Sequence, residues 1–159
     1  MIGHPTNVDE VGETYEENAA SKAIAAARAT GDRALGDDSG LEVEALNGAP
    51  GIRSARLAAT PSERIDTLLT ALAGRPQPWR ARFVAALALA TPDGAVRTVR
   101  GECSGEIVQP RGGGGFGYDP VFLVPERRRT MAELPDHEKD QVSHRGIAVR
   151  RLLESGWLS

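Results

Sequence analysis

Two adjacent carboxylates, Asp37 and Asp38, are the first residues in this sequence whose types and spacing could do chemistry. Ser39 and Gly40 follow them directly. Adjacent carboxylates at the end of a strand can offer oxygen ligands to a hard cation such as Mg²⁺. The same four residues are also typical of an exposed turn, in which aspartate accepts backbone hydrogen bonds. This segment alone leaves both interpretations open.

A second candidate segment begins with four consecutive glycines, residues 112–115, and continues as Phe116-Gly-Tyr-Asp-Pro120. Glycines let a backbone approach a ligand closely, and a flat side chain beside them suits the stacking of a nucleobase. The alternative is a hairpin loop whose phenylalanine closes the core. A mononucleotide-binding P-loop is excluded here, because no Gly-Lys-Ser/Thr sequence follows the glycines.

A third group comprises Lys139 and the run Ser143-His144-Arg145-Gly146, which lies where Ser143 is expected to cap a helix. The start of a helix favours a phosphate or a carbonyl-bearing base. Arg145 carries only hydrogen-bond donors. If it faces position six of a purine, it would therefore donate to a keto oxygen and disfavour an amino group. The alternative is an ordinary capped helix with a solvated face.

The elements that must position these residues alternate between helices and strands, which predicts an α/β fold with a long mixed β-sheet flanked by helices. We expect one domain over residues 1–159. Helices are predicted from the capping pattern at 14–17 to Gly31, from 60 to 74, at 130–134 and at 144–154. Strands are predicted at 33–37, 41–45, 81–91, 95–108 and 121–124, with residues 37–40 as a connection.

Composition restricts the partners. The chain has 159 residues with 19 Lys plus Arg against 22 Asp plus Glu, so no positive excess is available for a nucleic-acid backbone. The longest apolar run, residues 83–90, is too short for a membrane span, and the first residues do not resemble a signal peptide. We therefore expect no nucleic-acid partner, no membrane partner and a cytoplasmic location.

With Cys103 as the single cysteine and three scattered histidines, any metal is expected on oxygen ligands.

Taken together, five ordered segments resemble the inosine triphosphate pyrophosphatase family, which acts on non-canonical purine nucleoside triphosphates. The similarity runs from about Asp9 to the C-terminus. The segments are residues 13–23, Asp37-Asp-Ser-Gly-Leu41, Asn47-Gly-Ala-Pro-Gly-Ile52 with Ser54-Ala-Arg56, Phe116-Gly-Tyr-Asp-Pro120, and Ser143-His-Arg-Gly146.

The resemblance implies a homodimeric enzyme that uses Mg²⁺ to hydrolyse ITP, dITP and XTP to the monophosphate and pyrophosphate. By the same resemblance Asp38 is the proton acceptor and a metal ligand, Glu10 a second metal contact, and Lys22 a possible phosphate contact. The implied substrate-binding residues are Ser39, Phe116, Gly117, Tyr118, Asp119, Lys139, His144 and Arg145.

The sequence departs from the family pattern at its beginning. Family members carry a strand, a T-G-N-x-x-K loop that grips the triphosphate, and a helix. The nearest segment here, Thr6-Asn7-Val-Asp-Glu10, has glutamate where lysine is required. We expect a chain that is N-terminally truncated relative to the family, with a start placed too far downstream. The alternative function is a short paralogue that binds purine nucleotides without hydrolysing them.

Overall fold

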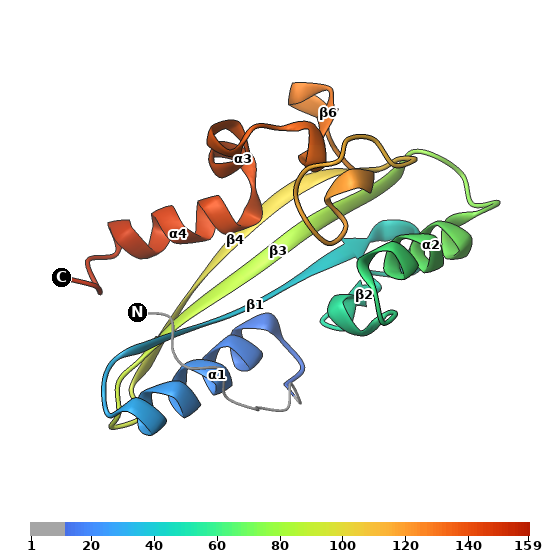
Figure 1. The fold of residues 1–159 in the computed structure, drawn as a ribbon. Coiled ribbons are helices and arrows are strands. Elements are labelled where there is room, and N and C mark those ends of the chain that lie inside the picture. Colours follow the sequence, from blue (N-terminus) through green and yellow to red (C-terminus); the bar gives the residue numbers. More distant parts are fainter. Residues whose placement is uncertain (1–11) are drawn as a thin grey trace.

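The computed structural model describes residues 12–159, in which helices lie against both faces of one long sheet (Figure 1). The helices are α1 (Tyr15–Thr30), α2 (Pro61–Leu72), α3 (Asp136–Val142) and α4 (His144–Glu154). The strands are β1 (Ala34–Val43), β2 (Pro50–Gly51), β3 (Trp79–Ala90), β4 (Val96–Ile107), β5 (Phe122–Val124) and β6 (Arg129–Thr130).

The sheet has the order β2-β1-β3-β4-β5-β6, and every strand pair within residues 12–159 is antiparallel. The predicted α/β class is confirmed, but a mixed sheet is not what the described residues form. Alternation of helices and strands predicts parallel pairs joined by crossovers. Here β1 and β3 pair antiparallel although α2 lies between them in the chain, so that helix does not make a parallel crossover.

Helix α1 begins and ends close to where the sequence predicts. The Thr14 hydroxyl accepts a hydrogen bond from the Glu17 backbone N–H, and Gly31 ends the helix in the left-handed conformation. The carboxylate of Glu17 accepts from the N–H of Glu13 and not, as a capping box predicts, from that of Thr14. The helix contributes small side chains to the core, which let it approach the sheet closely: Ala19, Ala23, Ala26 and Ala27.

The prediction of two short strands joined at residues 37–40 is wrong, because β1 is continuous from Ala34 to Val43. Gly36 and Gly40 are needed for close packing and not for a turn. A Cβ at Gly36 would overlap the backbone oxygen of Ala19, and one at Gly40 would lie 2.7 Å from the Tyr15 ring. The small residues that look like a turn therefore allow α1 to dock on the strand.

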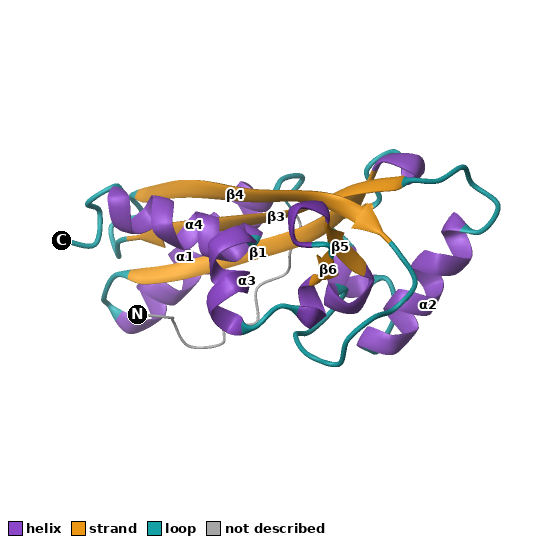
Figure 2. Ribbon diagram, turned by 90° about the horizontal axis from the view of Figure 1, so that it is seen from above, coloured by secondary structure: helices purple, strands orange, loops and turns teal. Residues whose placement is uncertain are grey.

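Side chains on β1 alternate between the two faces of the sheet, as in any strand. Asp38 contacts Asn18 of α1, whereas the next residue, Ser39, contacts Arg145 of α4. Figure 1 shows α1 and α4 on opposite sides of the long strands, and Figure 2 shows the same sheet from above. Neighbouring residues of β1 thus belong to different surfaces.

One edge of β1 is largely unpaired in the described part of the chain. On one side β1 pairs with β3 along its whole length. On the other side it pairs with β2 only at Leu41 and Glu42. Within residues 12–159, the segment from Ala34 to Gly40 therefore has no strand beside its outer edge.

The long hairpin of β3 and β4 is confirmed, and it supports a second apolar cluster with α2 and β5. Phe83 and Phe122 stack there with ring centroids 4.2 Å apart. The α2 capping box of Thr60 and Glu63 is also present. Cys103 is buried, and burial raises the pKa of its thiol to about 11. Among the helices of residues 12–159, none has the length and apolar character needed to cross a membrane.

Helix α4 packs on β4 at Gly101, and this contact gives a stability prediction. A Cβ at residue 101 would overlap the backbone oxygen of His144 and lie 2.6 Å from the Ala148 nitrogen. Gly101→Ala is therefore expected to lower the free energy of unfolding by about 1–3 kcal/mol, the usual range for overpacking. Urea denaturation measures the loss. Gly113→Ala is the matched control, because a Cβ there would meet nothing within 4 Å, and an equal loss in the control would contradict the packing argument.

Candidate active site

A cavity of about 330 Å³ opens on the α4 face of the sheet, between β1, α2, the 116–119 loop and the start of α4. Most of the residues predicted to bind substrate line it: Ser39, Phe116, Gly117, Tyr118, Asp119, His144 and Arg145. The structure thus gathers side chains that are more than 100 positions apart in the sequence. Arg64 of α2 and Ser54 also line the cavity, and they were not among the predicted site residues.

The Phe116 ring lies at the cavity with two cations against it. The ring is 56% exposed, so it does not close the core. The phenylalanines packed in the core are Phe83 and Phe122. The Lys139 Nζ lies 4.6 Å from the ring centroid and the Arg145 Cζ lies 4.7 Å from it. An exposed ring flanked by donors can stack with a second aromatic ring and offer hydrogen bonds to its edge.

Asp119 holds this loop in place. It is only 3% exposed, and its Oδ2 accepts a 2.6 Å bond from Lys139 Nζ and a 3.0 Å bond from the Phe116 N–H. Gly115, with φ +70°, makes the approach possible, because a Cβ at that position would overlap the Asp119 carboxylate. One buried carboxylate therefore fixes both the phenylalanine and the lysine.

Tyr118 anchors the other side of the loop. Its hydroxyl donates a 2.6 Å bond to the Ser54 carbonyl, and the Ser54 hydroxyl accepts a 2.8 Å bond from the Leu41 N–H of β1. Burial raises the pKa of Tyr118 to about 12, so the phenol remains a donor at neutral pH. No local sequence signal identifies Ser54 as this link, because its partners are 13 and 64 positions away.

His144 is a buried, neutral ring at the cavity wall. It stacks on Phe83 at a centroid distance of 4.6 Å. Burial, and then the charges of Arg145 and Lys139, lower the pKa of its imidazole to about 3. Its Nδ1 has no hydrogen-bond partner among the described residues. A buried polar atom without a partner favours a ligand group that could supply one.

Asp38 and Lys22 form a second cluster, on the α1 face of the sheet. The Asp38 carboxylate is 7% exposed; its Oδ2 accepts a 3.1 Å bond from Asn18 Nδ2, and its Oδ1 lies 3.7 Å from Lys22 Nζ. Lys22 also donates a 3.0 Å bond to the Asp37 carbonyl. Asp38 does not line the cavity, so the predicted site is divided between two faces.

The two clusters meet at the outer edge of β1. Arg145 Nη2 donates a 3.4 Å bond to Ser39 Oγ, and Ser39 is the neighbour of Asp38. Successive Cα atoms in a trans chain are about 3.8 Å apart. Within residues 12–159 no strand covers this edge. A ligand that crosses the edge can therefore contact the cluster around Phe116 and the cluster around Asp38 at the same time.

The residues that could hold a metal are only partly described. Glu10, the predicted second metal contact, lies outside the described residues, as does the segment Thr6–Glu10. Within residues 12–159, no group of three or more His, Cys, Asp or Glu side chains is arranged around a metal site. Asp37 projects to the face opposite Asp38, so the two adjacent carboxylates do not act as a pair. A single carboxylate still fits Mg²⁺, which is usually held by one or two carboxylates plus substrate phosphates.

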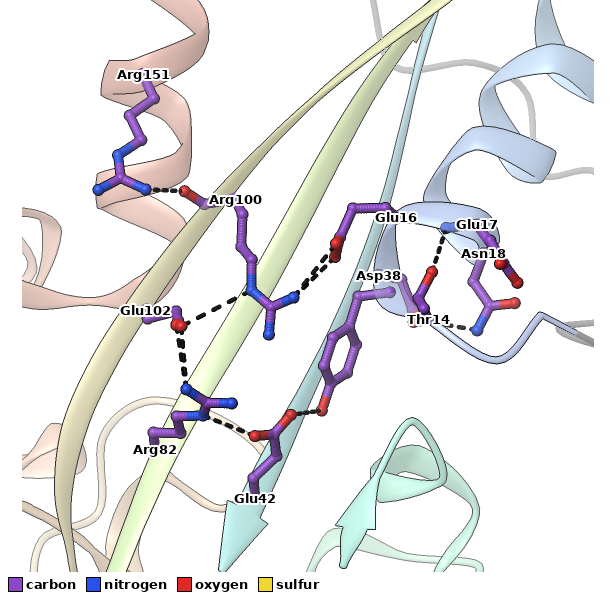
Figure 3. A network of polar contacts seen from close by, with 11 residues as sticks. Thr14, Glu16, Glu17, Asn18, Asp38, Glu42, Arg82, Arg100, Glu102 and Arg151 are labelled. Atoms are coloured by element: carbon purple, nitrogen blue, oxygen red, sulfur yellow. Dashed lines mark hydrogen bonds and ion pairs between the residues drawn. The ribbon is translucent and has the colours of Figure 1, made fainter. Parts of the chain in front are cut away.

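A network of charged side chains joins α1 to the strands beside Asp38 (Figure 3). Arg100 Nη1 donates a 3.1 Å bond to Glu16 of α1, and its Nε lies 3.8 Å from Glu102. Arg82 bridges Glu102 and Glu42 at 3.2 and 2.7 Å. The start of α1 is thereby held on the sheet at the position from which it contacts Asp38.

The chain is similar in sequence and in fold to known proteins. The dITP/XTP pyrophosphatase of Gloeobacter violaceus is 56% identical over 147 residues, which are 92% of this chain and 75% of the relative. That of Thermosynechococcus vestitus is 52% identical over 158 residues, 97% of this chain and 81% of the relative. A solved HAM1 protein from Coxiella burnetii superposes with a TM-score of 0.90 at 44% identity, covering 97% of this chain and 82% of that one. The Ham1 family model matches residues 2–155, and the chain therefore belongs to the Ham1 family.

Proposed function

We propose that this protein hydrolyses non-canonical purine nucleoside triphosphates, namely ITP, dITP and XTP, to the monophosphate and pyrophosphate, and so clears them from the nucleotide pool. The observation that carries the proposal is the cradle around Phe116, with Lys139 and Arg145 against an exposed ring and neutral His144 in the cavity wall. The relatives named dITP/XTP pyrophosphatases support the choice of substrate.

Recognition of the base rests on the donors of Lys139 and Arg145, which lie over the Phe116 ring. Arg145 has donors and no acceptor, so it pairs with a keto oxygen and leaves a donor unpaired against an amino group. Lys139 keeps donors beyond the one given to Asp119. A base that covers these donors without accepting from them leaves them unpaired, which discriminates between otherwise similar ligands. The cavity thus favours 6-keto purines over adenine.

We assign the hydrolytic step to Asp38, on the α1 face of the sheet. We propose that Asp38 orients a water molecule and takes its proton as the water oxygen attacks the α-phosphorus. The bond from that phosphorus to the bridging oxygen breaks, and pyrophosphate leaves with the electron pair. We also propose that Lys22, whose Nζ lies 3.7 Å from Asp38 Oδ1, contacts the phosphates and stabilises the charge that develops.

We propose Mg²⁺ as the metal, held by Asp38 and Glu10 together with the substrate phosphates. When bound, this ion would neutralise charge on the departing pyrophosphate. We also propose a homodimer in the cytoplasm; the exposed apolar side chains Val149 and Leu153 on α4 are surface that a second chain could cover.

Measuring pyrophosphate release from ITP and ATP side by side, with Mg²⁺ present, tests the proposed function. We expect kcat/KM for ITP to exceed that for ATP by at least about 100-fold, because the amino group of adenine opposes the Arg145 donors and cannot accept a hydrogen bond from them. In Arg145→Ala the ratio is expected to fall by about tenfold or more. Equal rates with the two nucleotides in the wild-type protein would remove the base-recognition argument. Binding of ITP by calorimetry without turnover would instead identify a non-catalytic nucleotide-binding protein.

A further inference from the structure

Asn18 of α1 is a fully buried polar side chain that contacts the proposed catalytic carboxylate directly. It is 2% exposed. Its Nδ2 donates a 3.1 Å bond to Asp38 Oδ2 (Figure 3). A buried amide in a helix interior is costly unless both its ends are hydrogen-bonded. Its partners therefore indicate why it is there.

The orientation of the amide is fixed by its second partner. Asn18 Oδ1 accepts a 2.9 Å bond from the backbone N–H of Gly12. The oxygen must face this donor, so the nitrogen must face Asp38; the reversed amide would oppose two donors at Gly12 and two acceptors at Asp38. The side chain thus acts as a rigid bridge between the chain before α1 and β1.

Gly12 makes this bridge possible. A Cβ at residue 12 would lie 2.7 Å from Asn18 Oδ1 and 2.8 Å from the Glu17 Cβ. Any side chain there would displace the amide without changing either member of the Asn18–Asp38 pair. A substitution at residue 12 therefore tests the Asn18–Asp38 hydrogen bond without changing either of the two bonded residues.

The charged network described above restrains the helix that carries Asn18. Glu16, two residues earlier, is held by Arg100 of β4. Tyr15 donates a 3.0 Å bond to Glu42, which lies on the same face of β1 as Asp38. Asn18 is thereby supported from the strands, so its contact with Asp38 does not depend on the helix end alone.

We infer that Asn18 is a positioning residue, which holds the Asp38 carboxylate in the rotamer that serves the attacking water; this inference rests on the proposed function. The bond occupies Oδ2 and restrains rotation of the carboxylate about its Cβ–Cγ bond. A misplacement of about 1 Å in a catalytic group can lower the rate about 100-fold. Asn18 does not line the base cavity, so it acts on the chemical step and not on base binding.

The test compares steady-state kinetics of ITP hydrolysis by Asn18→Asp and Asn18→Leu with wild type. Asn18→Leu removes the donor to Asp38 without adding a charge, whereas Asn18→Asp keeps an acceptor for the Gly12 N–H but places a second carboxyl against Asp38. We expect kcat to fall about 10- to 100-fold in both variants, with KM for ITP within about threefold of wild type. Gly12→Ala is expected to lower kcat in the same direction by a smaller factor.

Thr14→Ala is the matched control, because it weakens the same end of α1 without touching Asp38. It is expected to lower the melting temperature while leaving kcat within about twofold. If Asn18→Leu retains wild-type kcat, or if Thr14→Ala loses as much kcat, Asn18 merely stabilises the helix and the inference is wrong. Where Asn18→Leu fails to fold, Gly12→Ala decides by the same criterion.

Failure of the proposed function is distinguishable from failure of this inference. If the wild-type protein releases no pyrophosphate, the proposed function fails, and crystal structures of the wild type and Asn18→Leu then decide the role of Asn18. A rotated Asp38 carboxylate in Asn18→Leu supports positioning. An unchanged carboxylate in that variant overturns it.

Discussion

Asp38→Asn is expected to lower kcat for ITP hydrolysis by about 1000-fold or more, while the protein remains folded. General-base catalysis contributes about 100- to 10,000-fold, and the amide can neither take a proton nor offer the metal a charged ligand. The substitution keeps the size and shape of a buried side chain, so packing against α1 is retained. Stopped-flow or coupled assays of pyrophosphate release measure the loss, and circular dichroism checks the fold.

Asp37→Asn is the matched control for this prediction. It removes the same charge from the neighbouring residue, whose exposed side chain lies on the opposite face of β1. Its kcat is expected to stay within about tenfold of wild type, since it contacts neither the proposed water nor its orienting groups. Asp38→Asn with near-wild-type turnover would remove Asp38 from the mechanism. Equal losses in both variants would contradict the division of the site between two faces.

The second large effect is expected at Asp119, where Asp119→Asn should raise KM for ITP about tenfold or more and also destabilise the fold. The substitution removes the negative charge that lies 2.6 Å from the Lys139 ammonium, most of whose side chain is buried. Breaking a buried pair costs about 3–5 kcal/mol, and the partial exposure of Lys139 reduces the expected loss to about 1–3 kcal/mol. Lys139 and Phe116 both lose their fixed positions, so base binding weakens.

A double-mutant cycle with Lys139→Met distinguishes pairing from general damage to the loop. If the two charges act as one unit, the double variant is about as stable as Asp119→Asn alone, with a coupling of about 1–3 kcal/mol. Urea denaturation provides the stabilities and ITP kinetics provide the KM values. Strictly additive losses would show that Asp119 works through the Phe116 N–H bond and not through Lys139.

The sequence predicted which residues lie together at the candidate site better than it predicted their local structure. Resemblance identified Phe116, Lys139, His144 and Arg145; in the structure Phe116, His144 and Arg145 line one cavity, and Lys139 lies over the Phe116 ring. The segment around Asp38 was predicted partly as a connection, because acidic residues followed by serine and glycine are typical of turns. Whether such glycines bend a chain or admit a helix depends on what packs against them, which local sequence does not contain.

Other features had no local signal. Helix α3 begins at Asp136 without a side-chain cap, so the usual starting pattern is absent and the segment was not predicted as helical. The helix predicted at 130–134 is a single 3₁₀ turn, Met131–Glu133, although its capping box is present. Ser54 and Asn18 matter through partners on distant elements, and such contacts arise only when the chain folds.

The opposite orientation of Asp38 and Ser39 also bears on what happens after cleavage. Under the proposed mechanism, a nucleoside triphosphate contacts both sides of the outer edge of β1 at once, whereas each product spans only part of that path. The nucleoside monophosphate would keep its contacts around Phe116 and lose those near Lys22. Pyrophosphate would keep only the contacts near Lys22. Hydrolysis itself thus converts one two-point ligand into two one-point ligands, which favours rapid departure of both and weak inhibition by accumulated product.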